Sequence, residues 1–400
     1  MTKKEPLLFL CHRIPFPPNK GDKIRSFNIL KQLSDKYDIY LAAFVDDDND
    51  WQYEKDLQPY CKEVLLVRLH PLRGKIKGLS GMLFGKPISL PYFHSSRIQQ
   101  WVKQIIDSAE IKKGFVYSSA MAQYIEDVQL DKRVADFVDV DSDKWRQYAN
   151  NTANPLLKLV YNWESRTLAS YEKKITTEFD AVTLVSEDEA AFFREQLPAG
   201  LATKVDAFPN GVDGEFFNPD TSGPRPIEAQ YLVFTGAMDY WANVDAVLWF
   251  VEHVWPVIHK QHPAMKFAIV GGNPVDKVKA LARLDNILVT GRVEDIRPYI
   301  KHAQLAVAPL RIARGIQNKV LEAMAMEQAV VMTSMAAEGI RLPANQQPLV
   351  SDEADLFAGI CLEMLAQPEK MAALGHENRE WIAHHYQWQA VVEKLAGVLK

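Results

Sequence analysis

The sequence predicts an α/β protein made of two Rossmann-like domains, and three observations lead to this class. Short apolar runs rich in β-branched residues alternate with segments of helical periodicity along most of the chain. These runs are almost continuously apolar, which is typical of parallel strands buried on both faces. The chain has 400 residues, 48% hydrophobic and 24% charged, which is enough for two separate cores.

The expected strands form two sets with the same alternation. The first set covers 7–11, 39–45, 64–69, 115–118, 134–138 and 181–185, and the second covers 231–235, 266–270, 287–290, 305–308, 329–333 and a short segment near Leu349. Between the sets, segments 209–213 and 218–226 are rich in Pro and Gly and indicate a linker. In open α/β sheets the ligand lies beyond the carboxyl ends of the strands, so two such domains facing each other would form a deep cleft.

Composition excludes several classes. A formal net charge of −5 gives no global attraction to nucleic acid. The three cysteines are far apart and form no CxxC or Cys/His cluster, so a reducing cytoplasm fits best. No apolar run approaches the ~18 residues of a membrane span, so we expect a cytoplasmic protein whose membrane contact is at most peripheral to the inner membrane.

The segment 308–326 carries the strongest functional signal, because it runs from an apolar strand through a basic, glycine-bearing turn into a helix. Free amides at a helix start, next to Arg314, Gly315 and Lys319, are suited to a diphosphate. With helix from Arg314 onwards, Glu322 would lie roughly 12 Å away, within reach of ribose hydroxyls. Alternatively, Lys319 and Glu322 form an ordinary i,i+3 ion pair at the start of a core helix.

The loop after the first strand offers a second set of candidates. Gly21 precedes a helix and lets backbone amides approach a ligand, while Asp22, Lys23 and Arg25 are candidates for contacts with acceptor or phosphate. A plain strand-to-helix connection with solvated lysines is the alternative. The loop is not GxGxxG and the chain has no Walker motif, so hydride transfer and P-loop chemistry are poorly supported.

Three carboxylates, Asp139, Asp141 and Asp143, alternate where an expected strand ends. Alternate residues share a strand face, so these side chains could orient sugar hydroxyls, act as a base or hold Mg²⁺ or Mn²⁺. A solvated acidic turn that caps the next helix is the alternative.

Glycine turns also end two strands of the second set, at Gly236 and Gly271. Each could be a tight turn without a ligand. Together with Gly315, however, they bring three glycine turns to one edge of one domain, which favours a binding site for the donor.

The segment 71–87 mixes cations with apolar residues and glycines. It could rest on an anionic bilayer. An exposed loop with a short packed helix is the alternative.

Several motifs in this order resemble GT-B glycosyltransferases of family 4. They are 209–213 with Phe216 and Phe217, then 234–236, 269–272, 289–295, and 315–326 followed by 329–333. Segments 13–26 and 138–145 are similar to the sugar transferases of bacterial exopolysaccharide and PEP-CTERM systems, and 382–388 resembles the closing helix of the family. The resemblance implies an acceptor domain at 1–207, a nucleotide-sugar domain at 208–380 and a terminal helix at 381–400 that crosses back to the first domain. It also implies a retaining transferase that needs neither metal nor other cofactor.

Two departures from the family pattern affect the site. Glu322 matches the second glutamate of the E-x7-E element, but Arg314 stands at the first. Ala237 and Ala242-Asn243 occupy the stretch where the family often has an Arg and a Lys as phosphate clamps, so we expect Arg314 and Lys319 to take over.

The catalytic candidates follow from these departures. Many members have a histidine after the fifth strand of the first domain, where this chain has the three aspartates, and we select Asp141. Arg314 is the second candidate, because positive charge on the leaving diphosphate should provide the largest electrostatic contribution.

We therefore expect a hexosyltransferase that uses a nucleoside diphosphate sugar and a glycan or lipid-linked acceptor in exopolysaccharide biosynthesis, with no nucleic-acid partner. Two alternatives stay open: a GT-B epimerase that acts on the nucleotide sugar, and a binding module that senses this ligand without turnover. A product assay without acceptor separates the first alternative, and donor binding without transfer in a lysate would favour the second.

Overall fold

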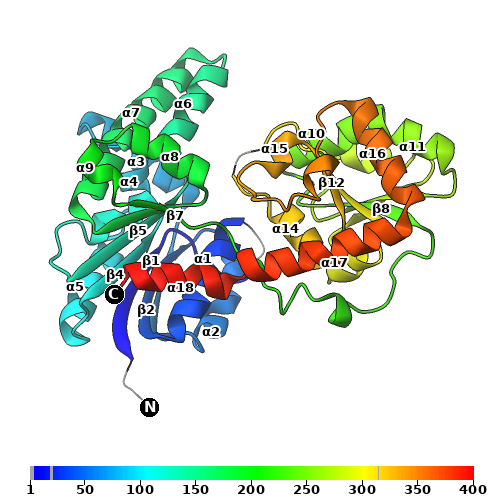
Figure 1. Cartoon of the computed structure of the whole chain (residues 1–400). Coiled ribbons are helices and arrows are strands. Elements are labelled where there is room, and N and C mark those ends of the chain that lie inside the picture. Colours follow the sequence, from blue (N-terminus) through cyan, green and yellow to red (C-terminus); the bar gives the residue numbers. More distant parts are fainter. Residues whose placement is uncertain (1–3, 19–20, 314) are drawn as a thin grey trace. The chain divides into compact units, whose positions relative to one another are not determined.

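The computed structural model describes residues 4–18, 21–313 and 315–400. The chain forms two compact units (Figure 1). Unit 1 comprises residues 1–209 and 391–400, and unit 2 comprises residues 210–390. The expected domain boundaries were 207/208 and 380/381.

Unit 1 contains a seven-stranded parallel sheet of order β3-β2-β1-β4-β5-β6-β7. Its strands are β1 (Glu5–Cys11), β2 (Tyr37–Val45), β3 (Cys61–Arg68), β4 (Lys113–Tyr117), β5 (Lys132–Val138), β6 (Ala181–Leu184) and β7 (Val205–Ala207). Leu7, Leu8, Phe9 and Leu10 of β1 are all inaccessible to solvent. Because successive side chains of a strand point to opposite faces, both faces of this sheet are covered.

The helices of unit 1 follow the strands in the usual alternation. They are α1 (Gly21–Ser34), α2 (Glu54–Leu57), α3 (Pro71–Leu83), α4 (Ser89–Tyr92), α5 (Ser96–Ser108), α6 (Asp141–Asn151), α7 (Pro155–Glu178), α8 (Glu187–Glu195), α9 (Ala199–Ala202), the 3₁₀ helices η1 (Asp48–Tyr53) and η2 (Ser119–Tyr124), and α18 (Trp388–Val398), which joins this unit from Val391. In Figure 1 the α6–α7 hairpin projects beyond the sheet.

Unit 2 contains a five-stranded parallel sheet of order β10-β9-β8-β11-β12. Its strands are β8 (Tyr231–Thr235), β9 (Lys266–Val270), β10 (Ile287–Gly291), β11 (Leu305–Ala308) and β12 (Val330–Met332). Phe234, Phe267 and Ile269 are fully buried in one apolar core with the helices around the sheet. The predicted pair of parallel-sheet, Rossmann-like domains is confirmed.

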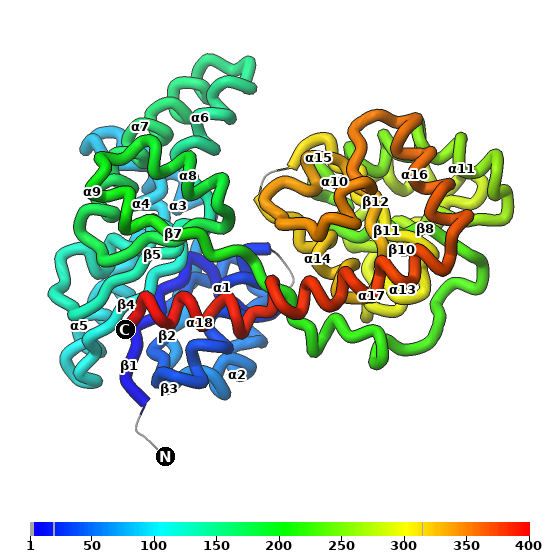
Figure 2. Tube along the Cα trace, in the orientation of Figure 1, coloured from blue at the N-terminus to red at the C-terminus, as the bar shows by residue number. Residues whose placement is uncertain are grey.

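The chain of unit 2 can be followed in the tube of Figure 2. Its helices are η3 (Pro219–Thr221, 3₁₀), α10 (Trp241–Trp249), η4 (Phe250–Val254, a π-helical turn), α11 (Trp255–Gln261), α12 (Asp276–Leu281), α13 (Arg297–Lys301), α14 (Asn318–Ala325), α15 (Ser334–Ala337), η5 (Gln347–Leu349, 3₁₀), α16 (Ala354–Ala366) and α17 (Pro368–His385).

Two strand predictions differ from the structure. β7 was not expected, because its three residues Val-Asp-Ala are too few for a period to be recognised. The short strand expected near Leu349 is wrong, because η5 covers this segment and only an isolated bridge joins Val350 to Met332.

The end of the chain contains two helices rather than one. α17 ends at His385 and α18 begins at Trp388. In this break the Tyr386 carbonyl accepts a hydrogen bond from the Val212 amide at 2.6 Å. A Cβ on Gly211 would lie 2.7 Å from the Trp388 ring, so the start of the interdomain segment fits here only as glycine.

Within the described ranges, no helix has both the length and the apolarity to span a bilayer.

Candidate functional site

The carboxyl edge of the unit 2 sheet brings the predicted donor residues together. β8 lies between β9 and β11, and the order of the strands along the chain reverses there. In open parallel sheets, ligands bind beyond the carboxyl ends of the strands at such a reversal. The residues that follow β8 and β9 and those that begin α14 therefore define the candidate site.

Two glycine turns form one rim of this edge. A Cβ on Gly271 would lie 1.7 Å from the carbonyl oxygen of Gly236, so the two turns are in direct backbone contact. Both glycines have positive φ angles, 157° for Gly236 and 155° for Gly271. The Gly236 amide donates to Val270 at 3.0 Å and the Met238 amide to Gly272 at 2.8 Å. Main chain rather than side chains therefore forms this rim, which lets a ligand approach closely.

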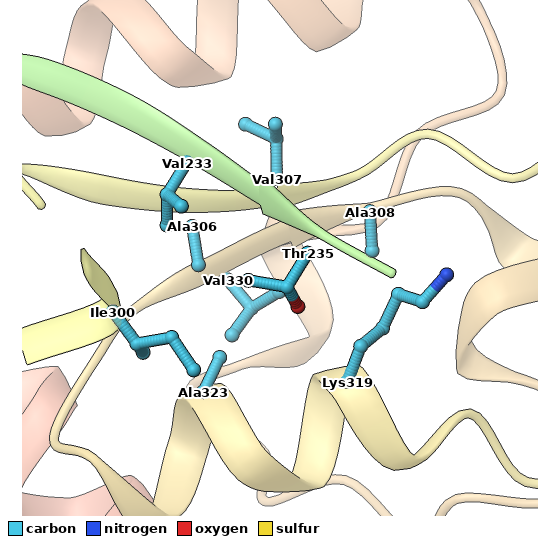
Figure 3. Close-up of a pocket in the computed structure, with 9 residues that line it drawn as sticks. All are labelled: Val233, Thr235, Ile300, Ala306, Val307, Ala308, Lys319, Ala323 and Val330. Carbon is cyan, nitrogen blue, oxygen red and sulfur yellow. The ribbon is translucent and has the colours of Figure 1, made fainter. Parts of the chain in front are cut away.

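Lys319 lies in the first turn of α14 and extends to the same rim. Its ammonium donates a hydrogen bond to the side-chain oxygen of Asn243 and lies 4.6 Å from the centre of the Phe234 ring. Figure 3 shows the side chain rising from α14 towards the end of β8, near Ala308 and Thr235. Its stem lines a cavity of about 10 Å³, the smallest space that holds one water. The stem is thus packed while the cation is held at the edge of the sheet.

Asn243, in the first turn of α10, links the turn that follows β8 to Lys319. Its amide nitrogen donates to the Ala237 carbonyl at 2.9 Å, which fixes the amide and aims its oxygen at Lys319. A Cβ on Gly236 would lie 3.3 Å from the Lys319 ammonium nitrogen. The cation of Lys319 therefore lies against the glycine turn that follows β8.

Lys319 and Glu322 have strongly shifted pKa values. Burial lowers the pKa of Lys319 from 10.5 to about 7, although Glu322 opposes this shift. Burial also raises the pKa of Glu322 from 4.5 to about 7, although Lys319 opposes it. Within the described chain the Glu322 carboxylate has no hydrogen-bond partner. A ligand of negative charge would therefore stabilise the charged form of Lys319, and a ligand hydroxyl that donates a hydrogen bond would stabilise the charged form of Glu322.

The start of α14 corrects one expectation. The helix begins at Asn318, and Gly315 precedes it with a positive φ of 66°. The assumption of continuous helix from Arg314 to Glu322, with its rise of roughly 12 Å, is therefore wrong. Lys319 and Glu322 are separated by a helical rise of only about 4.5 Å. Arg314 itself lies outside the described residues.

The carboxyl edge of unit 1 holds a second polar group, centred on His12. His12 directly follows β1, stacks on the Tyr117 ring with centroids 5.7 Å apart, and lies 3.7 Å from the Asp22 carboxylate. Arg13 donates to the same carboxylate at 2.5 Å. Burial would raise the pKa of Asp22, but His12 and Arg13 lower it well below its usual range. Asp22 therefore stays ionised and holds His12 and Arg13 in place.

The expected ligand contacts of Lys23 and Arg25 need correction. Lys23 is 2% exposed and forms a salt bridge with Asp50 at 2.5 Å. Arg25 is 1% exposed and forms a salt bridge with Asp136 at 2.8 Å. Both cations therefore fasten α1 inside unit 1 and are not available to acceptor or phosphate. Gly21, in contrast, is the exposed first residue of α1.

The expected strand face of three aspartates is also wrong. Val138 has a positive φ of 71°, which turns the chain after β5, and α6 begins at Asp141. Asp143 bonds Arg146 at 2.8 Å, whereas Lys144 lies 3.4 Å from both Asp139 and Asp141. Among the described residues, no three His, Cys, Asp or Glu side chains are grouped to hold a metal ion.

Two buried glutamates hold the loop that carries Asp139 and Asp141. Glu189 accepts from the Val140 amide at 2.9 Å. Glu172 accepts from the Ser142 amide at 3.2 Å and from its hydroxyl at 2.5 Å, and burial raises the pKa of Glu172 to about 8. Burial likewise raises the pKa of Asp141, which Lys144 opposes. Asp141 is thus presented at the carboxyl edge in a preorganised loop.

No role was predicted from the sequence for His12, Glu172 or Glu189. The position of His12, immediately after a strand and at the same edge as Asp139, was a usable signal. No comparable signal marked the glutamates, because Glu172 lies within a long helix and its partner is 30 residues away.

Comparison with known proteins agrees with this architecture. Residues 229–367 match the sequence model of the family Glycosyl transferases group 1. A 44.6 kDa protein of the cps region of Klebsiella pneumoniae is 22% identical over 95% of this chain and 96% of its own length. A GDP-mannose-dependent phosphatidylinositol monomannoside mannosyltransferase of Mycobacterium tuberculosis is 24% identical over 55% of this chain and 62% of its own length.

Solved structures share the fold over the whole chain. HepE of Anabaena in complex with UDP superposes with a TM-score of 0.69 at 12% identity, covering 98% of this chain and 99% of that one. WaaG, a glycosyltransferase involved in lipopolysaccharide biosynthesis, superposes with a TM-score of 0.64 at 14% identity, covering 98% and 99%. The chain therefore has the GT-B glycosyltransferase fold, and the match to the group 1 glycosyl transferases lies within unit 2.

Proposed function

We propose that the protein transfers a hexose, with retention of configuration, from a nucleoside diphosphate sugar to a glycan or lipid-linked acceptor in exopolysaccharide biosynthesis. The observation that carries this proposal is the Lys319 cation, held by Asn243 against the glycine turn that follows β8. Support for the pathway comes from the Klebsiella relative of the cps region, and support for a nucleotide ligand comes from the UDP complex of HepE.

In this proposal Lys319 and Arg314 bind the donor diphosphate, with Gly315 in the turn between them and main chain of the turns at Gly236 and Gly271 close to the ligand. Leaving-group charge grows as the sugar–phosphate bond breaks, so a fixed cation stabilises the transition state more than the bound donor. The Glu322 carboxylate, without a partner in the described chain, accepts hydroxyl hydrogens of the ribose.

Asp141 acts on the sugar or acceptor hydroxyl in this scheme, assisted by Asp139, Asp22 and the amides near Gly21. Its charge is balanced by Lys144 at 3.4 Å, and Glu172 and Glu189 keep its loop in position. In this proposal the acceptor binds to unit 1 and the donor binds to unit 2. The protein functions in the cytoplasm or at the inner membrane surface.

The proposal assigns no metal or other cofactor to the transfer. The Lys319 cation of unit 2 is held in place by Asn243 and would supply the charge that a divalent ion supplies elsewhere.

A thermal-shift panel of nucleotide sugars is the first test. A ligand at ~100 times its dissociation constant adds ~2.7 kcal/mol of stability, so the correct donor should raise the melting temperature clearly. The selected donor is then incubated with and without an acceptor extract. A modified donor without acceptor would favour the epimerase, and binding without any product would favour a binding module.

A further inference from the structure

Helix α3 carries its apolar side chains on the outside of unit 1. Leu72 and Ile76 are 77% and 73% exposed, Leu83 is 84% exposed, and Leu79 is also exposed. The spacing of these residues, four, three and four, places them along one stripe of the helix. A stripe of this kind normally faces a core, whereas here it faces solvent.

The inward side of α3 consists of glycines. A Cβ on Gly74 would lie 2.8 Å from the Tyr92 ring, one on Gly78 2.7 Å from Ile88, and one on Gly81 3.0 Å from the Pro87 carbonyl oxygen. The helix backbone therefore packs directly on the body of unit 1, and no side chain of this stripe has room inside. The outward orientation of the leucines follows from this packing.

The end of α3 is also fixed to α7, so the stripe is not a loose segment. The Trp163 indole donates to the Lys86 carbonyl at 3.2 Å, and Glu164 accepts from the amides of Ile88 and Ser89. The apolar surface is thus preformed in this unit.

A cationic pocket borders the stripe. It has a volume of about 240 Å³ and lies between α3, the end of β3 with the two residues that follow it, and segment 92–96. Its basic lining side chains are Arg68, His70, Arg73, Lys77 and His94, and no carboxylate lines it. Arg68 is paired with Asp48. Burial lowers the pKa of His94, and the positive charges of Lys77 and Lys86 add to this effect.

The flanking sequence increases this charge. Residues 70–87 contain four Lys or Arg residues and no acidic residue. This local excess of positive charge contrasts with the net charge of −5 of the whole chain. Apolar side chains at the surface with cations beside them match an anionic bilayer, whose headgroups attract the cations while the leucines enter the acyl boundary.

We propose that α3 is an interfacial helix that docks unit 1 on an anionic bilayer, with Leu72, Ile76, Leu79 and Leu83 inserted and a lipid phosphate seated in the pocket at Arg73 and Lys77. Docking on a bilayer does not depend on the transfer reaction. One consequence does rest on the proposed function: if the protein is a glycosyltransferase, docking indicates that its acceptor is carried by a phosphate-bearing lipid.

Cosedimentation of the full chain with vesicles tests the docking. We expect binding to vesicles of phosphatidylcholine mixed with phosphatidylglycerol, weakening with added salt, and little binding to phosphatidylcholine alone. The double variant Ile76→Ser/Leu83→Ser and the triple variant Arg73→Gln/Lys75→Gln/Lys77→Gln should each bind at least about tenfold more weakly. Matched controls are Leu284→Ser and Leu356→Ser, which change exposed leucines of unit 2, and Lys103→Gln, which changes an exposed lysine of α5.

Several outcomes would overturn the proposal: no binding to anionic vesicles, equal binding to neutral ones, or equal loss in the controls. Self-association that Ile76→Ser/Leu83→Ser abolishes, without vesicle binding, would make the stripe a contact between copies. Tight calorimetric binding of inorganic phosphate that Arg73→Gln abolishes while leaving vesicle binding intact would make the pocket a site for free phosphate. Nucleotide-sugar binding should be unchanged in every variant, so failure of docking is distinguishable from failure of the proposed function.

Discussion

Lys319 offers a prediction in which affinity depends on pH. The free protein holds this ammonium with a pKa of about 7, because burial disfavours the charge. A bound diphosphate favours the charged form, so binding above pH 7 must be coupled to uptake of a proton. Affinity for the nucleotide sugar is therefore expected to fall as the pH rises through 7.

The magnitude follows from the titration. With a pKa of about 7 the charged fraction falls from roughly nine-tenths at pH 6 to roughly one-tenth at pH 8. The dissociation constant should rise about tenfold over this interval, which corresponds to about 1.4 kcal/mol. Lys319→Met removes the titrating group and should weaken binding by about 1.5–3 kcal/mol at pH 6, with little further change at pH 8.

Glu322→Gln provides the matched variant. Glu322 raises the pKa of Lys319, so removing its charge should lower this pKa and move the loss of affinity to a lower pH. Isothermal titration calorimetry with the nucleotide sugar selected by thermal shift measures all three proteins. Buffers of different ionisation enthalpy report the proton uptake directly.

Two results would refute this reasoning. One is an unchanged affinity in Lys319→Met. The other is an equally steep pH dependence in Lys319→Met and in the unmodified protein, which would assign the titration to another group.

Four further predictions concern other residues. Glu322→Gln should also lose discrimination between ribo- and deoxyribonucleotides, and discrimination that persists in competition titrations refutes the ribose contact. Asp141→Asn should damage transfer far more than donor binding, so parallel loss in turnover assays and calorimetry would contradict its role. Turnover should survive excess EDTA, whereas activity lost in EDTA and restored by Mg²⁺ or Mn²⁺ would mean that the reaction requires a metal. Glu172→Gln should be more stable than the unmodified protein at pH 8 but not at pH 5. Because the pKa of Glu172 is raised, the folded state binds one more proton than the unfolded state between about pH 4.5 and pH 8. The free energy of unfolding of the unmodified protein therefore falls by up to about 1.4 kcal/mol per pH unit as the pH rises through this window. Equal melting curves of the variant and the unmodified protein at both pH values would contradict this.

The strands of unit 2 were predictable because polar residues and glycines mark their ends in the sequence. The apolar runs of β8 and β11 start after Gln230 and Gln304, and that of β9 follows Lys266. β8 and β9 end in a glycine turn, so the observed limits of these strands are those expected from the sequence. The glycines that limit the runs also form the rim of the site, which is why the donor side was visible in the sequence.

Unit 1 was less predictable because its polar residues have distant partners. Arg25 pairs with Asp136, 111 residues away, and no local pattern distinguishes such a buried cation from a ligand contact. The alternation of Asp139, Asp141 and Asp143 suggested a strand, but the register shift after Asp136 and the positive φ of Val138 turn the chain instead. A turn of this kind, at a residue other than glycine, leaves no compositional mark.

The most direct test of glycosyl transfer at this site is an isotope-transfer experiment. The protein is incubated with the selected nucleotide sugar, labelled in the hexose, and a lipid and glycan extract of a producing cell, and the product is analysed by mass spectrometry and NMR. We predict a labelled acceptor with the anomeric configuration of the donor, formed by the unmodified protein and largely lost in Lys319→Met. Label that stays on a stereochemically altered donor, or intact donor binding without any labelled product, would contradict the account.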